Sequence, residues 1–169
     1  MPRIRSFLPI ADPQAETLIL GSMPGAASLK AGQYYAHPQN QFWRIIAGLL
    51  GLPEGTDYAD RVQALGARRI ALWDVLDSCV RPGSMDSAIT GEAPNDFRSF
   101  FLEHRRITRV FFNGAKAEAS FRKHCRPVMV EFPRLHYHRL PSTSPAHASL
   151  PYARKLAAWR AILRQEVLP

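Results

Sequence analysis

The hydrophobic positions of this chain form two kinds of pattern that alternate along the sequence. Continuous apolar runs are typical of strands buried on both faces, and they occur at residues 17–20, 69–75 and 109–112, with two further short candidate strands at 128–132 and 135–140. Between them apolar residues recur every three or four positions, which predicts helices over 40–50, 57–65, 115–124 and 151–167, and one that follows a cap at Asn95 or Asp96 and runs through His104. The segment 76–94 carries Pro and Gly repeatedly and is expected to be a long loop.

This alternation of strands and helices predicts the fold class. It is typical of an α/β fold with three layers, α/β/α, around a central and mostly parallel sheet. The number of apolar runs predicts a sheet of four to five strands. The chain has 169 residues and shows no repeat and no linker, so residues 1–169 are expected to form a single domain.

The charge balance favours a polyanionic partner. Lys and Arg outnumber Asp and Glu by 22 to 14, which gives a net charge of +8 and an isoelectric point near 10.1. Nucleic acid fits this surplus, although a generally basic protein would show it too. The two cysteines, Cys79 and Cys125, are too few for a four-thiolate cluster, and no metal or other cofactor is expected.

The chain shows no pattern that predicts a membrane segment or a leader. No apolar run approaches the roughly 20 residues that a membrane-spanning helix needs, and no signal-peptide pattern opens the sequence. We therefore expect a cytoplasmic protein that does not contact a membrane, with its two cysteines reduced.

The segment that follows the first predicted strand is the most informative one. Residues 21–43 read GSMPGAASLKAGQYYAHPQNQFW and lie between the strand and an amphipathic helix. Loops at the carboxyl ends of strands in open α/β sheets are where ligands bind. This loop is too long, and too rich in Gly, Tyr, His, Asn and Gln, to be only a connector.

Three short motifs carry the most specific residue combinations. Residues 21–25 read GSMPG, residues 35–43 read YAHPQNQFW, and residues 142–146 read STSPA. In order and spacing they resemble the uracil-DNA glycosylase superfamily, most closely its hypoxanthine-DNA glycosylase branch. The first resembles the loop that activates water, the second an extension shared with the mismatch-specific branch, and the third the motif that inserts into DNA.

The resemblance implies a monofunctional, metal-free DNA glycosylase that acts in base excision repair. Its substrate would be DNA with a deaminated base, hypoxanthine first and uracil as the alternative, and it would work as a monomer without an obligate protein partner. A non-catalytic DNA-binding member of the same fold is a further alternative. A small-molecule enzyme on a flavodoxin-like sheet is disfavoured, because no Walker loop or GxGxxG follows any predicted strand.

The resemblance also implies which residue performs catalysis. Met23 stands where the uracil and mismatch branches carry Asn or Asp, and a thioether cannot orient water. In the hypoxanthine branch this role is attributed to the Asn of the extension. That residue is Asn40 here, and its amide carbonyl would orient the water. From its position alone, Asn40 could equally cap the following helix.

Four residues are expected to bind the base. Tyr35 aligns with the aromatic residue that stacks on the flipped base, and Met23 lies in the first motif. Asp74 ends the second strand and would accept the ring N–H of the base, although it could instead cap a turn or pair with Arg69 or Arg81. Asn113 ends the third strand and would read the base or, more simply, cap the next helix.

A further set of residues is expected to contact the DNA backbone or the gap left by the flipped base: Ser22, Gly25, Ser142, Ser144, Pro145 and Ala146. Ser142 stands where the uracil branch has its catalytic His, and Ala146 where it has a large inserting Leu. Several basic residues flank these loops, and some of them are expected to contact phosphates: Arg81, Lys116, Arg134, His136, His138, Arg139 and His147.

Overall fold

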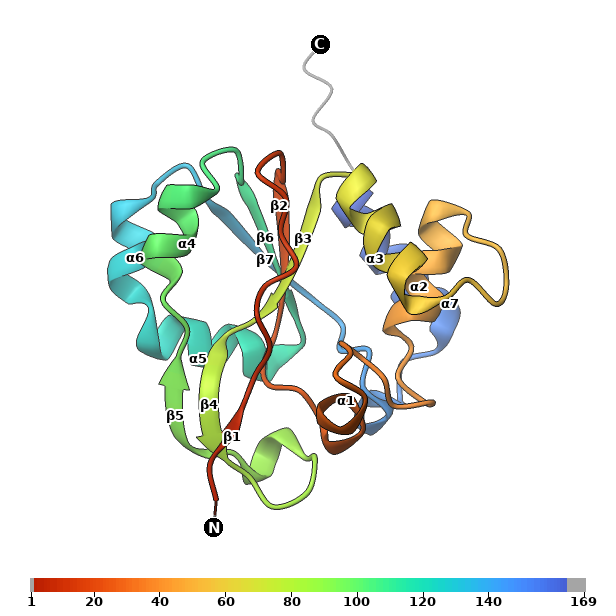
Figure 1. Cartoon of the computed structure of the whole chain (residues 1–169), viewed down its shortest axis with the longest axis horizontal. Helices are drawn as coiled ribbons and strands as arrows, with labels where there is room; N and C mark the ends of the chain where they lie inside the picture. The colour runs from red at the N-terminus through yellow and green to blue at the C-terminus, as the bar shows by residue number, and fades with distance from the viewer. Residues whose placement is uncertain (1, 164–169) are drawn as a thin grey trace.

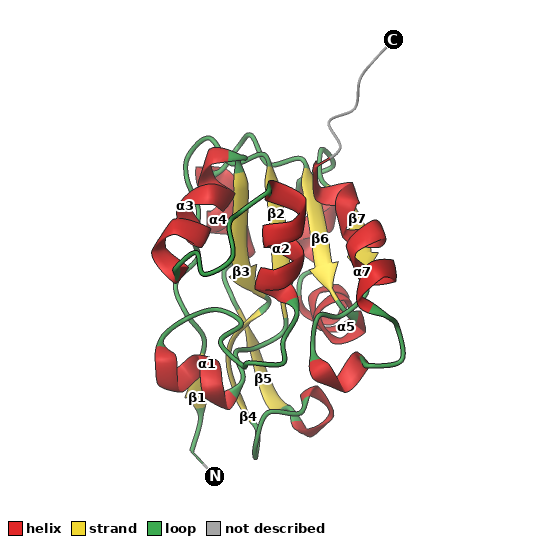
Figure 2. Ribbon diagram, turned by 90° about the vertical axis from the view of Figure 1, so that its right-hand side faces the viewer, coloured by secondary structure: helices red, strands yellow, loops and turns green. Residues whose placement is uncertain are grey.

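A computed structural model of the chain describes residues 2–163 and contains two sheets (Figures 1 and 2). The larger sheet has four parallel strands in the order β3-β2-β6-β7, with bounds Ile70–Asp74, Thr17–Gly21, Arg109–Asn113 and His136–Leu140. Helices cover both of its faces, as Figure 1 shows. The predicted three-layer α/β fold is therefore confirmed, with a central sheet at the lower end of the predicted size.

The central strand β2 explains why a continuous apolar run was a reliable signal. All five residues of β2 are buried. Leu18 and Leu20 belong to the hydrophobic core on one face of the sheet, and Ile19 belongs to the core on the other face. Because successive side chains of a strand point to opposite faces, every side chain of a strand covered on both sides is buried, and apolar residues are favoured at each position.

Six helices form the two outer layers. One layer holds α2 (Phe42–Leu50), α3 (Tyr58–Ala67) and α7 (Tyr152–Trp159), and the other holds α4 (Phe97–Glu103), α5 (Ala115–His124) and α6 (Arg126–Glu131). Their ends follow local rules: the Asp57 and Asp96 side chains accept from main-chain N–H groups three residues later, and Gly51 ends α2 with a φ of 68°. Asp96, rather than Asn95, is thus the cap of α4. None of the described helices is long and apolar enough to cross a membrane.

The segment 76–94 is not the loop that its Pro and Gly content predicted. It contains β4 (Leu76–Val80) and β5 (Thr90–Pro94), which form a small antiparallel sheet with β1 (Ile4–Arg5), and a 3-10 turn, η1 (Asp86–Ala88), connects them. Neither strand is a continuous apolar run, because this sheet is only partly buried. Two register irregularities between β4 and β5 weaken the pattern further.

Three other differences concern helices. The strand predicted over 128–132 is wrong: these residues belong mainly to α6, which starts with Pro127 near its first position, and a short apolar run cannot separate a strand from a helix. A short helix, α1 (Ala26–Ala31), lies unpredicted inside the loop after β2. The terminal helix ends at Trp159 and continues as a 3-10 turn, η3 (Arg160–Leu163); predicted residues 164–167 lie outside the described part.

The topology of the large sheet determines where a ligand can bind. From β2 the chain first moves to β3 on one side and later to β6 on the other. In open α/β sheets such a reversal of strand order opens a crevice at the carboxyl ends of the strands. Here that crevice lies where the first and second predicted motifs begin.

Candidate active site

A cavity of about 610 Å³ opens at the carboxyl ends of β2, β3 and β6. This size is typical of a pocket for a small organic group. All of the residues predicted for the site line the cavity: Ser22, Met23, Gly25, Tyr35, Asn40, Asp74, Asn113, Ser142, Ser144, Pro145 and Ala146. Their individual roles stay predictions, but the structure brings them to one place from five segments of the chain.

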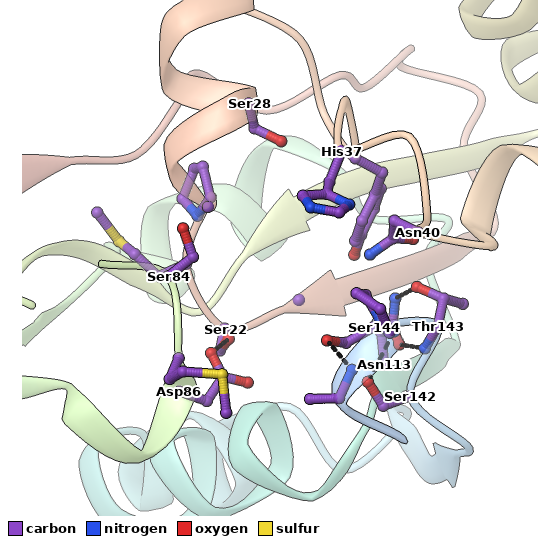
Figure 3. A pocket seen from close by; sticks show the side chains of 18 of the residues that line it. Ser22, Ser28, His37, Asn40, Ser84, Asp86, Asn113, Ser142, Thr143 and Ser144 are labelled. Carbon is purple, nitrogen blue, oxygen red and sulfur yellow. Dashed lines mark hydrogen bonds between the residues drawn. The ribbon is translucent and has the colours of Figure 1, made fainter. Parts of the chain in front are cut away.

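Hydrogen bonds join the motifs around Thr143, which is fully buried. The Asn113 Oδ1 atom accepts from the main-chain N–H of Thr143 at 3.0 Å, and the Asn113 Nδ2 atom donates to its hydroxyl at 3.0 Å (Figure 3). The main-chain N–H of Gln41 donates to the carbonyl oxygen of Thr143 at 3.0 Å. The 142–146 loop is thereby held between the end of β6 and the start of α2.

This arrangement corrects the expectation that Asn113 caps the next helix. The cap position of α5 is Gly114, and no side chain bonds to the free N–H groups there. Gly114 has a φ of 92°, and a Cβ atom at this position would lie 2.9 Å from Cβ of Ser142. Only glycine lets the two segments approach so closely. The amide of Asn113 therefore positions the 142–146 loop, and its contact with a base stays a prediction.

Two polar groups lie together at the inner end of the cavity, the Asp74 carboxyl and the Tyr35 hydroxyl. Asp74 is 3% exposed, and its Oδ2 atom is buried without a hydrogen bond, while the Tyr35 hydroxyl interacts with the Asn113 side chain. Gly21 makes room for both, because a Cβ atom there would lie 2.5 Å from Oδ1 of Asp74 and 2.7 Å from the Tyr35 hydroxyl. Buried polar groups are rarely left unpaired in native proteins. Both residues line the cavity, so the unpaired Asp74 oxygen lies at the edge of a candidate ligand site.

Burial, together with the neighbouring charge of Asp86, raises the pKa of Asp74 to about 7, and Arg81 partly opposes this shift. The alternative pairing of Asp74 with Arg69 is wrong, because Arg69 pairs with Glu16 at 2.8 Å. Arg81 donates to main-chain carbonyl oxygens instead of to Asp74. The carboxyl group is therefore left without an ion-pair partner in contact.

Tyr35 is held in an unusual conformation. Its φ of 56° lies in the left-handed region, which is uncommon for a residue with a large side chain and often marks a functional site. Its ring stacks on Phe42 with centroids 4.1 Å apart, so a base could stack only on the other face. Burial raises the pKa of Tyr35 well above its usual value, and the nearby Asp74 charge adds to this shift. Its neighbour Tyr34 is a core residue, 4% exposed.

Asn40 bonds to the first N–H group of the following helix from outside the cap position, and it can still take part in a second interaction. Its Oδ1 atom accepts from the main-chain N–H of Phe42 at 2.9 Å (Asn40 is labelled in Figure 3). The helix itself starts at Phe42, two residues later than predicted, with Gln41 in the cap position. An amide carbonyl has two lone pairs, so the bond to Phe42 leaves one that can orient a water molecule.

One wall of the cavity was missed by the sequence reasoning. Residues 84–87 line it, and side-chain hydrogen bonds tie them to the first motif. The Ser22 hydroxyl donates to Oδ1 of Asp86 at 2.8 Å, and the Ser84 hydroxyl accepts from the main-chain N–H of Ala26 at 2.8 Å. Arg81, which is 6% exposed, donates to the carbonyl oxygens of Pro24 and Gly83. The available signal was the length of the predicted loop, since long loops are often functional.

Comparison with known proteins decides the family. The model of the protein family described as "Uracil DNA glycosylase superfamily" matches residues 8–165 of this chain. The chain belongs to the uracil DNA glycosylase superfamily. It is therefore an enzyme that cleaves bases from DNA, and DNA is its substrate. The residues that resemble the superfamily's motifs surround one cavity, which is the arrangement this chemistry needs.

Individual relatives agree with this assignment. Two proteins named hypoxanthine DNA glycosylase, from Methanosarcina barkeri and Methanosarcina acetivorans, are each 38% identical over 114 residues, covering 67% of this chain and 72% of theirs. A solution NMR structure from Methanosarcina acetivorans, titled as a candidate uracil DNA glycosylase, superposes with a TM-score of 0.80. It shares 31% identity, with 96% of this chain and 100% of that chain covered.

For this DNA glycosylase, three of the basic residues expected at phosphates are already used inside the fold. Arg81 is buried as described, Lys116 pairs with Glu92 at 2.8 Å, and Arg134 donates to the carbonyl oxygens of Phe101 and Ile107. The expectation that some of the flanking basic residues contact phosphates stays a prediction. His147, in contrast, lines the cavity.

The described residues offer no group of three or more His, Cys, Asp or Glu that could hold a metal ion. Chemistry without a metal stays a prediction for this glycosylase, and its amide and carboxyl side chains are the groups that could carry it.

Proposed function

We propose that this DNA glycosylase hydrolyses the N-glycosidic bond of deoxyinosine and releases hypoxanthine. The observation that carries the proposal is the buried and unpartnered Asp74 carboxyl, which lies beside the Tyr35 ring at the inner end of the cavity. A flipped base stacked on Tyr35 would present a ring N–H to that carboxyl. The two relatives named hypoxanthine DNA glycosylase support this choice of base.

The remaining groups supply the other requirements of the reaction. As the bond breaks, positive charge develops on the sugar and negative charge on the departing base. Asn40 would orient the water that attacks the sugar carbon, through the carbonyl lone pair that Phe42 leaves free. None of the described residues that line the cavity is a lysine, so we expect hydrolysis without a Schiff base and without strand cleavage.

Two walls of the cavity would contact the DNA around the flipped nucleotide. The 142–146 loop offers Ser144, Pro145 and Ala146, of which Pro145 and Ala146 are exposed. Ala146 is too short to fill the gap alone. Among the large exposed hydrophobic side chains of the described residues, Met85, at 56% exposed, is the one that lines the cavity. We propose that Met85 fills part of this gap from the opposite wall.

Uracil is the second candidate base. It presents the same pair of groups, a ring N–H beside a carbonyl, and a structural relative with 31% identity is titled as a candidate uracil DNA glycosylase. The test uses labelled oligonucleotides with deoxyinosine, deoxyuridine, deoxyxanthosine or no damage, incubated with excess protein and then treated with alkali. Cleavage mainly at deoxyinosine is expected. Cleavage mainly at deoxyuridine would reverse the order of the two bases.

We also propose that residues 1–169 act as one domain and as a monomer in the cytoplasm, without an obligate protein partner. The support is that a single copy of the chain supplies every wall of the cavity. Light scattering on the protein with and without a damaged duplex checks this, and a mass of two copies on one lesion would contradict it.

A further inference from the structure

Asp74 can bind the base either as an ionised carboxylate or as a neutral acid, and the choice between these protonation states rests on the proposed function. The carboxyl has two oxygens in different situations. Oδ1 lies next to Gly21, and Oδ2 is buried without a partner. The Nδ2 atom of Asn95 donates to the main-chain carbonyl of Asp74 at 2.8 Å and not to its carboxyl. The carboxyl is thus held at the end of β3 with its Oδ2 atom unpaired.

The edge of the base has two neighbouring groups of opposite kind. Hypoxanthine, like uracil, presents a ring N–H donor beside a carbonyl acceptor. An ionised carboxylate only accepts, so it would satisfy the N–H and repel the carbonyl oxygen beside it. A neutral carboxyl carries one O–H donor and one acceptor oxygen, which matches both groups of the base at once.

We propose that Asp74 binds the base as a neutral carboxylic acid, accepting from the ring N–H with one oxygen and donating its O–H to the adjacent carbonyl oxygen. The second bond also serves the reaction. When the N-glycosidic bond breaks, its electron pair leaves with the base, and negative charge reaches this carbonyl oxygen. A neutral donor stabilises that charge, whereas a carboxylate would oppose it. The acid keeps its proton, so the step needs no proton transfer.

The charged and titratable groups around Asp74 favour the neutral form. Asp86, on η1, is bonded to Ser22 and places a second negative charge nearby. Among the described residues, Arg81 is the cation that counteracts this charge, and its guanidinium donates to main-chain oxygens through Nε and Nη2 while Nη1 stays unpaired. Tyr34 and Tyr35 stay neutral, since burial raises the pKa of each far above neutrality. These surroundings agree with the raised pKa of the Asp74 carboxyl, near 7.

The test is the pH dependence of single-turnover cleavage from pH 5 to 9, on whichever of deoxyinosine or deoxyuridine the protein cleaves. Because the pKa of Asp74 is raised, the neutral form dominates below about pH 7, so cleavage should be high there and fall as the pH rises. In Asp74→Asn the amide still offers one donor and one acceptor in the same shape. This variant should keep most of the low-pH activity, and its cleavage rate should no longer fall as the pH rises (the falling limb of the pH profile).

Four other variants complete the test. Asp74→Ala should lose on the order of 100-fold in rate, as when one charge-stabilising donor is removed. Asp86→Asn removes the nearby negative charge, so the pKa of Asp74 drops and the limb moves to lower pH. His37 and His147 also line the cavity and histidines titrate in the same range, so the limb should persist in His37→Gln and His147→Gln.

The opposite results would overturn the proposal. If cleavage rises with pH through this range, and if Asp74→Asn is as inactive as Asp74→Ala, then Asp74 binds the base as an ionised carboxylate. A measurement without catalysis separates this from failure of the proposed function: the side-chain carboxyl signal of Asp74, assigned by its loss in folded Asp74→Asn, is followed by NMR. A midpoint near 4 rejects the neutral acid even if the protein cleaves no oligonucleotide.

Discussion

The cavity has two walls of different construction. One, the sheet-end wall, consists of the carboxyl ends of β2, β3 and β6 with the 142–146 loop against them. Its residues are fixed by strand register, since Gly21 lies opposite Asp74 in the β2–β3 pair. The other, the 81–88 wall, contains only one short 3-10 turn and is tied by side-chain hydrogen bonds from Arg81, Ser84 and Asp86.

This difference separates two tasks. Bond cleavage needs groups fixed within a fraction of an ångström, and main-chain pairing in a buried sheet provides that. Contact with a variable DNA duplex tolerates adjustment, and a segment held by a few side-chain bonds provides it. We therefore expect changes at the sheet-end wall to reduce the rate strongly, and changes at the 81–88 wall to affect mainly DNA binding.

The largest effect is expected from Asn40→Ala, beside the sheet-end wall. Loss of the amide that orients water should lower the single-turnover rate about 100-fold or more, with DNA binding retained. The lost bond to Phe42 should also cost about 1 kcal/mol of stability. The matched control is Asp57→Ala, which removes a comparable cap from α3 and should destabilise without slowing cleavage. Equal rates for both variants would remove Asn40 from catalysis.

A methyl group at Gly21 should have the next largest effect. In Gly21→Ala the added Cβ would lie 2.5 Å from Oδ1 of Asp74, so the carboxyl or the strand must shift. We expect about 1–3 kcal/mol of destabilisation and a rate loss on the order of tenfold to 100-fold. Gly66→Ala, at a helical glycine with open space around it, is the control and should be stabilising. Chemical denaturation and single-turnover assays check both, and an active, stable Gly21→Ala would show that the inner end of the cavity is adjustable.

A smaller effect is expected where the two motifs meet. Thr143→Val keeps the shape of the side chain but leaves Nδ2 of Asn113 without its acceptor. The expected cost is about 1 kcal/mol of stability, with a modest rate loss, because the main-chain bonds of Thr143 remain. Thr56→Val removes a hydroxyl bond within an exposed turn and should change neither quantity. A rate unchanged in Thr143→Val would mean that the bonds made by the main chain of residue 143, to Asn113 Oδ1 and to Gln41, are enough to position the loop.

The smallest effect is expected at the 81–88 wall. Met85→Ala should raise KM for a damaged duplex about fivefold, the equivalent of roughly 1 kcal/mol of apolar burial, and leave the single-turnover rate at saturation nearly unchanged. The substrate with the lesion in a single strand has no gap to fill and should be unaffected. Val130→Ala is the control, since Val130 is 81% exposed but does not line the cavity. A large fall in the saturated rate would contradict the division between the walls.

The same comparison shows what could be predicted from sequence. The strands β2, β3 and β6 were found because both of their faces are buried, and the motifs at their ends followed from that placement. The 81–88 wall could not be found, because the strands β4 and β5 that flank it are only partly buried and β4 pairs with Ile4 and Arg5 far away in sequence. The bonds of Asn113 depend on Thr143, thirty residues later, and no local rule anticipates such a partner.

One contact has a consequence for how such a site can evolve. The Arg81 guanidinium bonds to the carbonyl oxygens of Pro24 and Gly83. Every amino acid has such a main-chain carbonyl, whatever its side chain. The anchor of the 81–88 wall therefore does not depend on the identity of the neighbouring side chains. Mutations can therefore replace Met85, Ser87 and Ala88 without loosening this anchor, whereas Asp86 also bonds to Ser22 and acts on Asp74.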